Sequence, residues 1–184
     1  EAEKVAEQVM KFINSESKAE SRHLAEIRGA FPGFKSSVFA DTGEAPLRNA
    51  TTTTIAPTGT ISIIADCSSG IEPLFAVSYT RNVLDGKTLT EFHPGFIEMA
   101  KEEGVYNSEF IKEVTDSSSV NEISFLPEKM KKVFRTAADI PIEWHIRIQA
   151  AFQRHTDNAV SKTINFPKEA LVKDVSDAYM LAWE

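Results

Sequence analysis

The chain has 184 residues, of which 42% are hydrophobic and 26% are charged, a composition typical of a globular protein that can bury a core. Its formal net charge of -7 argues against sequence-independent binding to polymeric DNA or RNA, because such binding needs many lysines and arginines to neutralise phosphates. No segment approaches the roughly 18 apolar residues that cross a bilayer, and no signal-peptide pattern opens the sequence. We therefore expect a cytoplasmic protein that binds neither membranes nor polymeric nucleic acid.

Cys67 is the only cysteine, which excludes a disulfide within the chain and a zinc site made of four cysteines. No histidine lies near it in the sequence, so we expect a structural role for this thiol. The chain has no initiator methionine and stops within an apolar, helix-like run at Trp183. Because we find no linker or repeat, we expect residues 1–184 to form a single unit cut from a longer protein.

Residues 1–57 predict two helices followed by a strand. Apolar residues at helical spacing predict a first helix; they are Val5, Val9, Phe12 and Ile13. A second set predicts another helix that ends at residues 31–33; it consists of Ala19, Leu24 and Ile27. Both helices are expected to cover a sheet. Residues 50–56 are rich in β-branched side chains and predict a buried strand, which Pro57 ends.

The middle of the chain predicts shorter elements. A short apolar segment at 61–65 precedes a second strand at 75–81, and Asp85-Gly86 is a turn signal that closes this strand. Three short amphipathic helices are expected at the periphery of the fold, at residues 94–103, 108–114 and 127–134.

Residues 141–157 form the most regular predicted helix, and one of its faces is expected to lie in the core. That face carries Trp144, Ile148, Ala151, Phe152 and His155. Residues 159–165 alternate like a strand, and a last helix follows, with apolar residues at Val175, Ala178, Tyr179 and Leu181. Strand, helix and strand in this order predict an α/β fold with parallel strand pairing.

Residues 58–62 join the first predicted strand to a potential helix start, and this position suits an anion. Unpaired backbone N–H groups and the positive end of a helix dipole point at such a turn, and Gly59 leaves room for a phosphate. The candidate phosphate-binding residues are Thr58, Gly59, Thr60, Ile61 and Ser62. Taken alone, these residues fit an ordinary glycine turn with a threonine cap at least as well. The Gly-Lys-Ser/Thr ending of a Walker A loop is absent, so ATP hydrolysis is not predicted.

Longer stretches around this turn resemble the vitamin-B12-dependent (class II) ribonucleotide reductases. Residues 47–62, LRNATTTTIAPTGTIS, resemble the substrate phosphate-binding region of that family, and the similarity returns at 69–73, 79–81 and 145–165. The resemblance implies a fragment of a larger catalytic barrel domain, namely the late strands and covering helices of the ten-stranded α/β barrel shared with glycyl-radical enzymes. It covers nearly the whole chain and is weakest at residues 101–141.

The resemblance also implies an activity for the parent protein: reduction of ribonucleotides to 2'-deoxyribonucleotides by a thiyl radical, which homolysis of the Co–C bond of adenosylcobalamin generates. The family needs a radical cysteine, a pair of reducing cysteines and further cysteines on a C-terminal tail. None of that set is present here, so we assign no catalytic residue to the fragment and expect it to be inactive alone. The implied partners are the ribonucleotide, as di- or triphosphate, and the remaining N-terminal part of the reductase; a homodimer of the parent is one arrangement that the family allows.

Two alternatives remain open. The large subunit of a diiron-dependent reductase has a similar loop but tends to carry an acidic residue at the position of Gly59, so the Thr-Gly-Thr sequence favours the B12 class. The other alternative is a non-catalytic piece of a split reductase, which binds nucleotide phosphates or docks onto a partner chain.

Four side chains outside the turn are also candidates. His145 and His155 share an apolar helix face and are expected at core or interface positions, and no metal ligand is predicted. Lys162 fits a phosphate contact and a surface position equally well. We expect Glu72 to orient a loop in preference to binding substrate.

Overall fold

The computed structural model describes residues 1–65, 67–82, 88–117 and 119–184. Its contacts divide the chain into two compact units, each assembled from separate stretches of sequence. Unit 1 consists of Glu1–Ile71, His145–Lys162 and Leu181–Glu184. Unit 2 consists of Glu72–Trp144 and Thr163–Met180.

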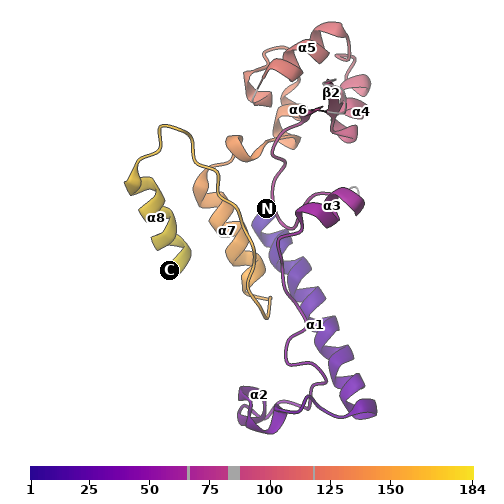
Figure 1. Ribbon diagram of the computed structural model, residues 1–184, viewed down its shortest axis with the longest axis vertical. Helices are drawn as coiled ribbons and strands as arrows, with labels where there is room; N and C mark the ends of the chain where they lie inside the picture. Colours follow the sequence, from indigo (N-terminus) through magenta and orange to yellow (C-terminus); the bar gives the residue numbers. More distant parts are fainter. Residues whose placement is uncertain (66, 83–87, 118) are drawn as a thin grey trace. The chain divides into compact units, whose positions relative to one another are not determined.

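Unit 1 is built around one long helix, α1 (Ala2–Arg28) (Figure 1). Glu3 in the first turn and Arg28 in the last turn both interact favourably with the helix dipole. The prediction of two helices is wrong, because residues 14–18 are polar but contain no glycine or proline that would interrupt the backbone hydrogen bonds. Gly29 ends the helix with a φ of 79°, a conformation that glycine adopts without strain.

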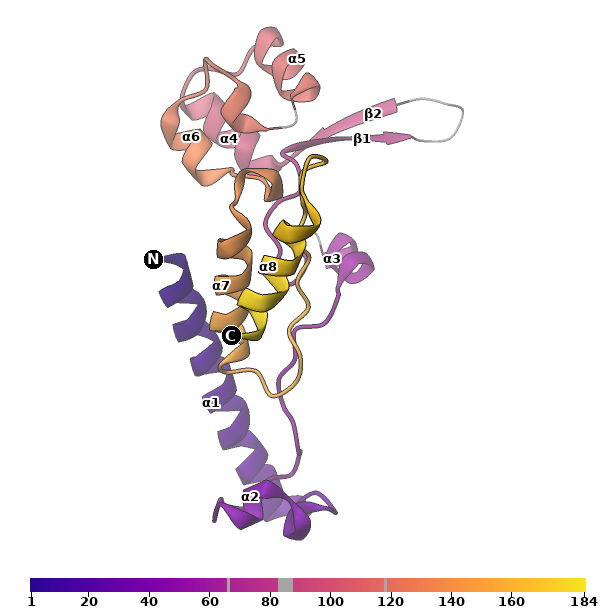
Figure 2. The ribbon, with the colours of Figure 1, turned by 90° about the vertical axis from the view of Figure 1, so that its left-hand side faces the viewer.

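The predicted helix at 141–157 is confirmed as α7 (Ile142–Gln153), and its residues from His145 onward belong to unit 1. This part lies beside the N-terminal half of α1 (Figures 1 and 2), where Arg154 pairs with Glu7 at 3.2 Å. The predicted core face is only partly right, because Ala151 is fully buried whereas Trp144 is 45% exposed. The side chains of α7 that the structure buries are His145, Ile146 and Ala151.

The two strands predicted at 50–56 and 159–165 are extended but do not form a regular ladder. They meet at a single parallel bridge between Ile55 and Val160. The Ser161 N–H donates to the Ile55 carbonyl at 2.7 Å, and the Ile55 N–H donates to the Ala159 carbonyl at 3.4 Å. The parallel direction was predicted correctly, and the prediction of full strands is wrong for the described chain. Thr54 and Ala159 have exposed side chains, so neither segment is packed between layers as a buried strand would be.

Short helices complete unit 1. Helix α2 (Val38–Asp41) follows a 3-10 turn at Phe34–Ser36, and α3 (Gly59–Ala65) forms from the apolar segment after the predicted strand. Leu47, between α2 and α3, is fully buried, and its carbonyl accepts the Phe31 N–H at 2.9 Å.

In unit 2 the predicted strand at 75–81 is confirmed in part, as β1 (Ser78–Asn82), which begins three residues later. It pairs antiparallel with β2 (Thr88–Phe92), in a register that runs from Ser78 opposite Phe92 to Asn82 opposite Thr88 (Figure 2). The predicted turn at Asp85-Gly86 lies outside the described residues.

All three short helices predicted for unit 2 are confirmed, as α4 (Pro94–Glu102), α5 (Ser108–Asp116) and α6 (Glu128–Val133). The expectation that they are peripheral is wrong, since their apolar faces form the core of unit 2. Phe96 stacks on Phe110 with ring centroids 5.4 Å apart, and Met130 beside them is fully buried. Short 3-10 turns at Val120–Glu122 and Ala137–Asp139 connect these helices.

The last predicted helix is confirmed as α8 (Val172–Trp183). Ala178 is its buried residue, whereas Val172 and Trp183 are 89% and 81% exposed. Within the described ranges, no helix combines the length and the apolar character needed to span a bilayer.

Candidate phosphate-binding turn

The predicted turn at residues 58–62 is the start of a helix, as the sequence indicated: α3 begins at Gly59. The Ser62 N–H donates to the Thr58 carbonyl at 2.9 Å and closes the first helical turn. Among the described residues, none accepts the amide hydrogens of Gly59, Thr60 and Ile61. Three such N–H groups at a helix start can hold an anion, because they point along the axis toward the positive end of the helix dipole.

The space next to Gly59 is open. A Cβ atom placed on this glycine would have no heavy atom within 4 Å, apart from its chain neighbours and its own helix. The φ of Gly59 lies outside the left-handed region, so the backbone does not itself demand glycine here. An anion can therefore approach the amides from this side, and a larger side chain would occupy the same space.

The three hydroxyl groups of the turn have different surroundings. The Thr58 hydroxyl accepts the Gly70 N–H at 3.1 Å and shares a hydrogen bond of 3.0 Å with the Ser69 hydroxyl. The Ser62 hydroxyl is buried and donates to the Gly59 carbonyl at 2.7 Å. Thr60 is exposed, and nothing in the described ranges hydrogen-bonds its hydroxyl. Thr58 and Ser62 thus hold the turn in shape, while Thr60 has a hydroxyl available for a ligand.

An open cavity of about 520 Å³ lies next to the turn within unit 1. Residues 52–56 and Thr58 form one wall, and Met10, Ile13 and Phe152 contribute apolar side chains. The turn and the extended segment before it therefore border the same hollow.

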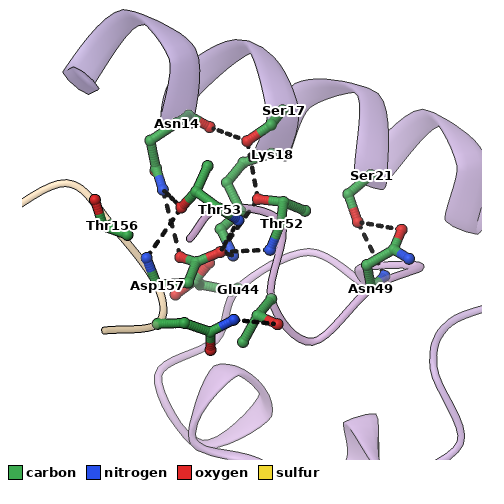
Figure 3. A network of polar contacts seen from close by, with 12 residues as sticks. Asn14, Ser17, Lys18, Ser21, Glu44, Asn49, Thr52, Thr53, Thr156 and Asp157 are labelled. Atoms are coloured by element: carbon green, nitrogen blue, oxygen red, sulfur yellow. Dashed lines mark hydrogen bonds and ion pairs between the residues drawn. The ribbon is translucent and has the colours of Figure 1, made fainter. Parts of the chain in front are cut away.

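Asp157 organises a polar network that the sequence did not reveal (Figure 3). Its Oδ2 accepts the Thr52 N–H at 2.6 Å and the Thr53 N–H at 3.3 Å, together with the Thr52 hydroxyl at 3.1 Å. The Lys18 Nζ lies 2.9 Å from the same oxygen, and the Asn14 amide donates to Oδ1 at 3.4 Å. These contacts join α1, the extended segment and the loop after α7.

The carboxyl group of Asp157 has a lowered pKa. Burial acts in the opposite direction and would raise the pKa, but the contact with Lys18 and the hydrogen bonds from Thr52 outweigh it. Only 12% of the Lys18 side chain and 16% of the Asp157 side chain are exposed, so solvent screens this pair less than it would screen an ion pair on the surface.

The lowered pKa of Asp157 predicts a pH dependence of stability. A carboxylate whose pKa is lower in the folded state stabilises the fold above its unfolded-state pKa of about 3.9, and this contribution disappears as the pH falls through the folded-state pKa. We expect Asp157→Asn to unfold at a lower temperature than wild type by the same margin at pH 7 and at pH 5, and this margin should shrink below about pH 4. Thermal unfolding of both proteins across this pH range measures the difference between their unfolding temperatures. A difference that stays constant down to pH 3 would contradict the role of the ionised carboxylate.

Of the remaining candidate residues, Cys67 adjoins the turn, because its N–H donates to the Ser62 carbonyl at 3.1 Å. Glu72 accepts the Thr163 N–H at 2.6 Å within unit 2, which agrees with an orienting role. His145 is buried, and His155 Nε2 lies 3.6 Å from a Glu7 carboxylate oxygen. Cys67 is a free, exposed thiol. No group of three His, Cys, Asp or Glu side chains that could hold a metal ion occurs in the part of the chain that the structure describes.

A family model described as "Ribonucleotide reductase, barrel domain" matches residues 1–184. The chain belongs to this family. It is 47% identical over 182 residues to a vitamin B12-dependent ribonucleoside-diphosphate reductase of Thermoplasma acidophilum, covering 99% of this chain and 23% of that protein. It is 46% identical over 184 residues to the protein of the same name from Mycobacterium tuberculosis strain CDC 1551, covering 100% of this chain and 26% of the relative.

The fold also matches that of a solved member of the ribonucleotide reductases. The class Id alpha subunit of Actinobacillus ureae superimposes with a TM-score of 0.80 at 22% identity, covering 98% of this chain and 32% of that one. This similarity concerns the fold alone. The chain spans about a quarter of the length of the two relatives above.

Proposed function

We propose that the protein containing this chain reduces ribonucleotides to 2'-deoxyribonucleotides, and that the turn at residues 58–62 binds the substrate phosphates. The observation that carries the phosphate assignment is the start of α3, where the amides of Gly59, Thr60 and Ile61 lack acceptors among the described residues and the space next to Gly59 is open. In a chain with a net charge of -7, backbone amides can offset a polyphosphate where cationic side chains are few.

The proposed substrate is a ribonucleoside diphosphate, because the relatives at 46–47% identity carry the name ribonucleoside-diphosphate reductase. Their vitamin B12-dependent names favour the cobalamin class over the diiron-dependent alternative. The partner of this chain is then the rest of the reductase, including the N-terminal part, and this chain contributes late strands and covering helices to the ten-stranded barrel. The reducing cytoplasm suits an enzyme that depends on thiols.

Adenosylcobalamin is the proposed cofactor of the parent protein, and it supplies the initiating radical when it is bound. The cobalt of this cofactor is held by the corrin ring itself, so its binding depends on contacts with the ring and its side groups, and no observation on the described residues identifies such contacts. We therefore assign no cobalamin-binding residue within this chain. The contribution of the described residues is to bind and orient the phosphates of the substrate.

Thr60→Ala tests the hydroxyl contribution to phosphate binding. The loss of one hydrogen bond to a charged group costs about 1.5 to 3 kcal/mol, so we expect the intact reductase to bind a ribonucleoside diphosphate roughly tenfold to a hundredfold more weakly. Affinity for the matching ribonucleoside should stay unchanged. Isothermal titration calorimetry of both ligands measures the difference.

A matched control for Thr60→Ala is Thr115→Ala, because Thr115 is exposed on α5 and, among the described residues, its hydroxyl donates only to the Ile111 carbonyl of the same helix. Thr115→Ala should change neither affinity. If Thr60→Ala leaves diphosphate affinity at the wild-type value, or weakens the nucleoside equally, the hydroxyl does not contact the phosphates.

A further inference from the structure

The carboxylate of Asp157 holds two consecutive backbone amides of the segment that leads into the phosphate turn. We propose that Asp157 is a positioning residue for substrate binding: it anchors Thr52 and Thr53 and thereby fixes where the turn at residues 58–62 presents its amides. This role rests on the proposed function, because it concerns how the same phosphate-binding turn is held in place.

Two residues of α1 contact the carboxylate of Asp157. The Lys18 ammonium, from the middle of α1, neutralises the carboxylate at 2.9 Å and lies 5.4 Å from the centre of the Phe39 ring. The Asn14 amide, one turn earlier on α1, donates both to Asp157 Oδ1 and to the Thr53 hydroxyl. Because one long helix supplies both partners, the carboxylate is fixed to a rigid element.

Further hydrogen bonds continue from Asp157 along the extended segment toward the turn. The Asp157 N–H donates to the Thr53 hydroxyl at 3.0 Å, and the Asn158 N–H donates to the Thr53 carbonyl at 3.1 Å. The Thr54 hydroxyl donates to the Ala159 carbonyl at 3.3 Å, and the bridge to Val160 fixes Ile55. The loop after α7 therefore holds residues 52–55 in one register, and the carboxylate of Asp157 binds the first two of them.

Little conformational freedom remains between this anchored segment and the turn. Only Ala56 and Pro57 separate Ile55 from Thr58. The proline ring fixes the φ of Pro57 and also restricts the backbone of Ala56. A shift of Thr52 and Thr53 is thus transmitted to Gly59 and Thr60, where a small displacement of the amides weakens their hydrogen bonds to phosphate.

The structure offers a matched control on unit 2. Asp139 accepts the Thr136 N–H and the Thr136 hydroxyl, both at 2.8 Å, and it also accepts hydrogen bonds from Asn121 and Ser119. Asp139 and Asp157 both accept a backbone amide, a threonine hydroxyl and a neutral amide side chain, and Asp157 also accepts a second backbone amide and pairs with Lys18. Asp139 belongs to a different unit from the turn, so Asp139→Asn reports the general cost of removing a carboxylate that caps a loop.

The test compares Asp157→Asn and Asp139→Asn in the intact reductase. We expect Asp157→Asn to weaken binding of a ribonucleoside diphosphate about tenfold, through misplaced amides, and to leave the matching ribonucleoside unaffected. KM should rise more than kcat falls, because the lost interaction already exists in the ground state. Asp139→Asn should leave both affinities at their wild-type values. Equal effects of the two variants, or no effect of either, would overturn the positioning role.

Two additional variants separate the possible failures. Asp157→Glu keeps the negative charge next to Lys18, and therefore the fold, but moves the carboxylate by one methylene. We expect this variant to bind the diphosphate about threefold more weakly or worse. Wild-type diphosphate affinity in this folded variant would also overturn the positioning role of Asp157. Gly59→Val examines the turn directly. If Gly59→Val weakens diphosphate binding and Asp157→Asn does not, only the positioning role is wrong; if Gly59→Val has no effect, the phosphate assignment itself is wrong.

Discussion

In the intact reductase, Gly59→Val is expected to weaken binding of a ribonucleoside diphosphate by about a hundredfold or more, because it displaces the phosphate from at least two charge-assisted N–H contacts worth about 1.5 to 3 kcal/mol each. The affinity for the matching ribonucleoside should change little. The substitution is informative because a Cβ atom at Gly59 meets no described heavy atom within 4 Å, so no neighbour in this chain obstructs the first added carbon. Calorimetric titration with both ligands gives the two affinities.

Gly33→Val is the control for this experiment. Gly33 also belongs to unit 1, is exposed, has a φ of -85°, and has room for a Cβ atom at ordinary contact distance from the Phe31 ring. The Gly33→Val substitution should leave the affinity for the ribonucleoside diphosphate unchanged. A wild-type diphosphate affinity for Gly59→Val, with the fold intact by circular dichroism, would mean that the start of α3 is only a turn.

The chain by itself is expected to form no deoxyribonucleotide, even with adenosylcobalamin and a dithiol. Removal of the 2'-hydroxyl as water consumes two electrons, which a pair of cysteines supplies as it is oxidised to a disulfide. This chain has one cysteine, Cys67, and it is exposed on the surface of unit 1. It therefore cannot provide both a radical thiol and a reducing pair.

Chromatographic assay of product from a radiolabelled ribonucleoside diphosphate measures this activity. The full-length reductase, purified and assayed in parallel, is the positive control, and adding the remaining part of the reductase to the chain should restore turnover. Product formation by the chain alone, free of contaminating reductase, would contradict our account of where the chemistry lies.

The sequence alone determined several local elements and the family. Helices α4, α5 and α6 were predicted close to their observed bounds, because each depends on contacts between neighbouring residues and on local start signals such as Pro94 and Asn107. The helix start at Gly59 was predicted for the same reason. The resemblance of residues 47–62 and 145–165 to class II reductases also needed no structure, since those stretches are long and specific.

The sequence was less informative where an element depends on distant partners. Strands at 50–56 and 159–165 were predicted from β-branched composition and alternation, but a ladder also needs neighbouring strands, and the described chain provides only the contact between Ile55 and Val160. The helices of unit 2 were placed at the periphery because their short apolar faces do not indicate that Phe96, Phe110 and Met130 meet in one core.

Only the tertiary structure revealed the network around Asp157. Its carboxylate lies 105 positions from Thr52 along the chain and 139 positions from Lys18, so no local pattern connects them. The structure also distinguished the hydroxyls of the turn: Ser62 donates to the Gly59 carbonyl, whereas Thr60 is exposed. Residue types in a short segment determine which hydrogen-bonding groups are present, but the fold decides which of those groups already have partners and which remain available to a ligand.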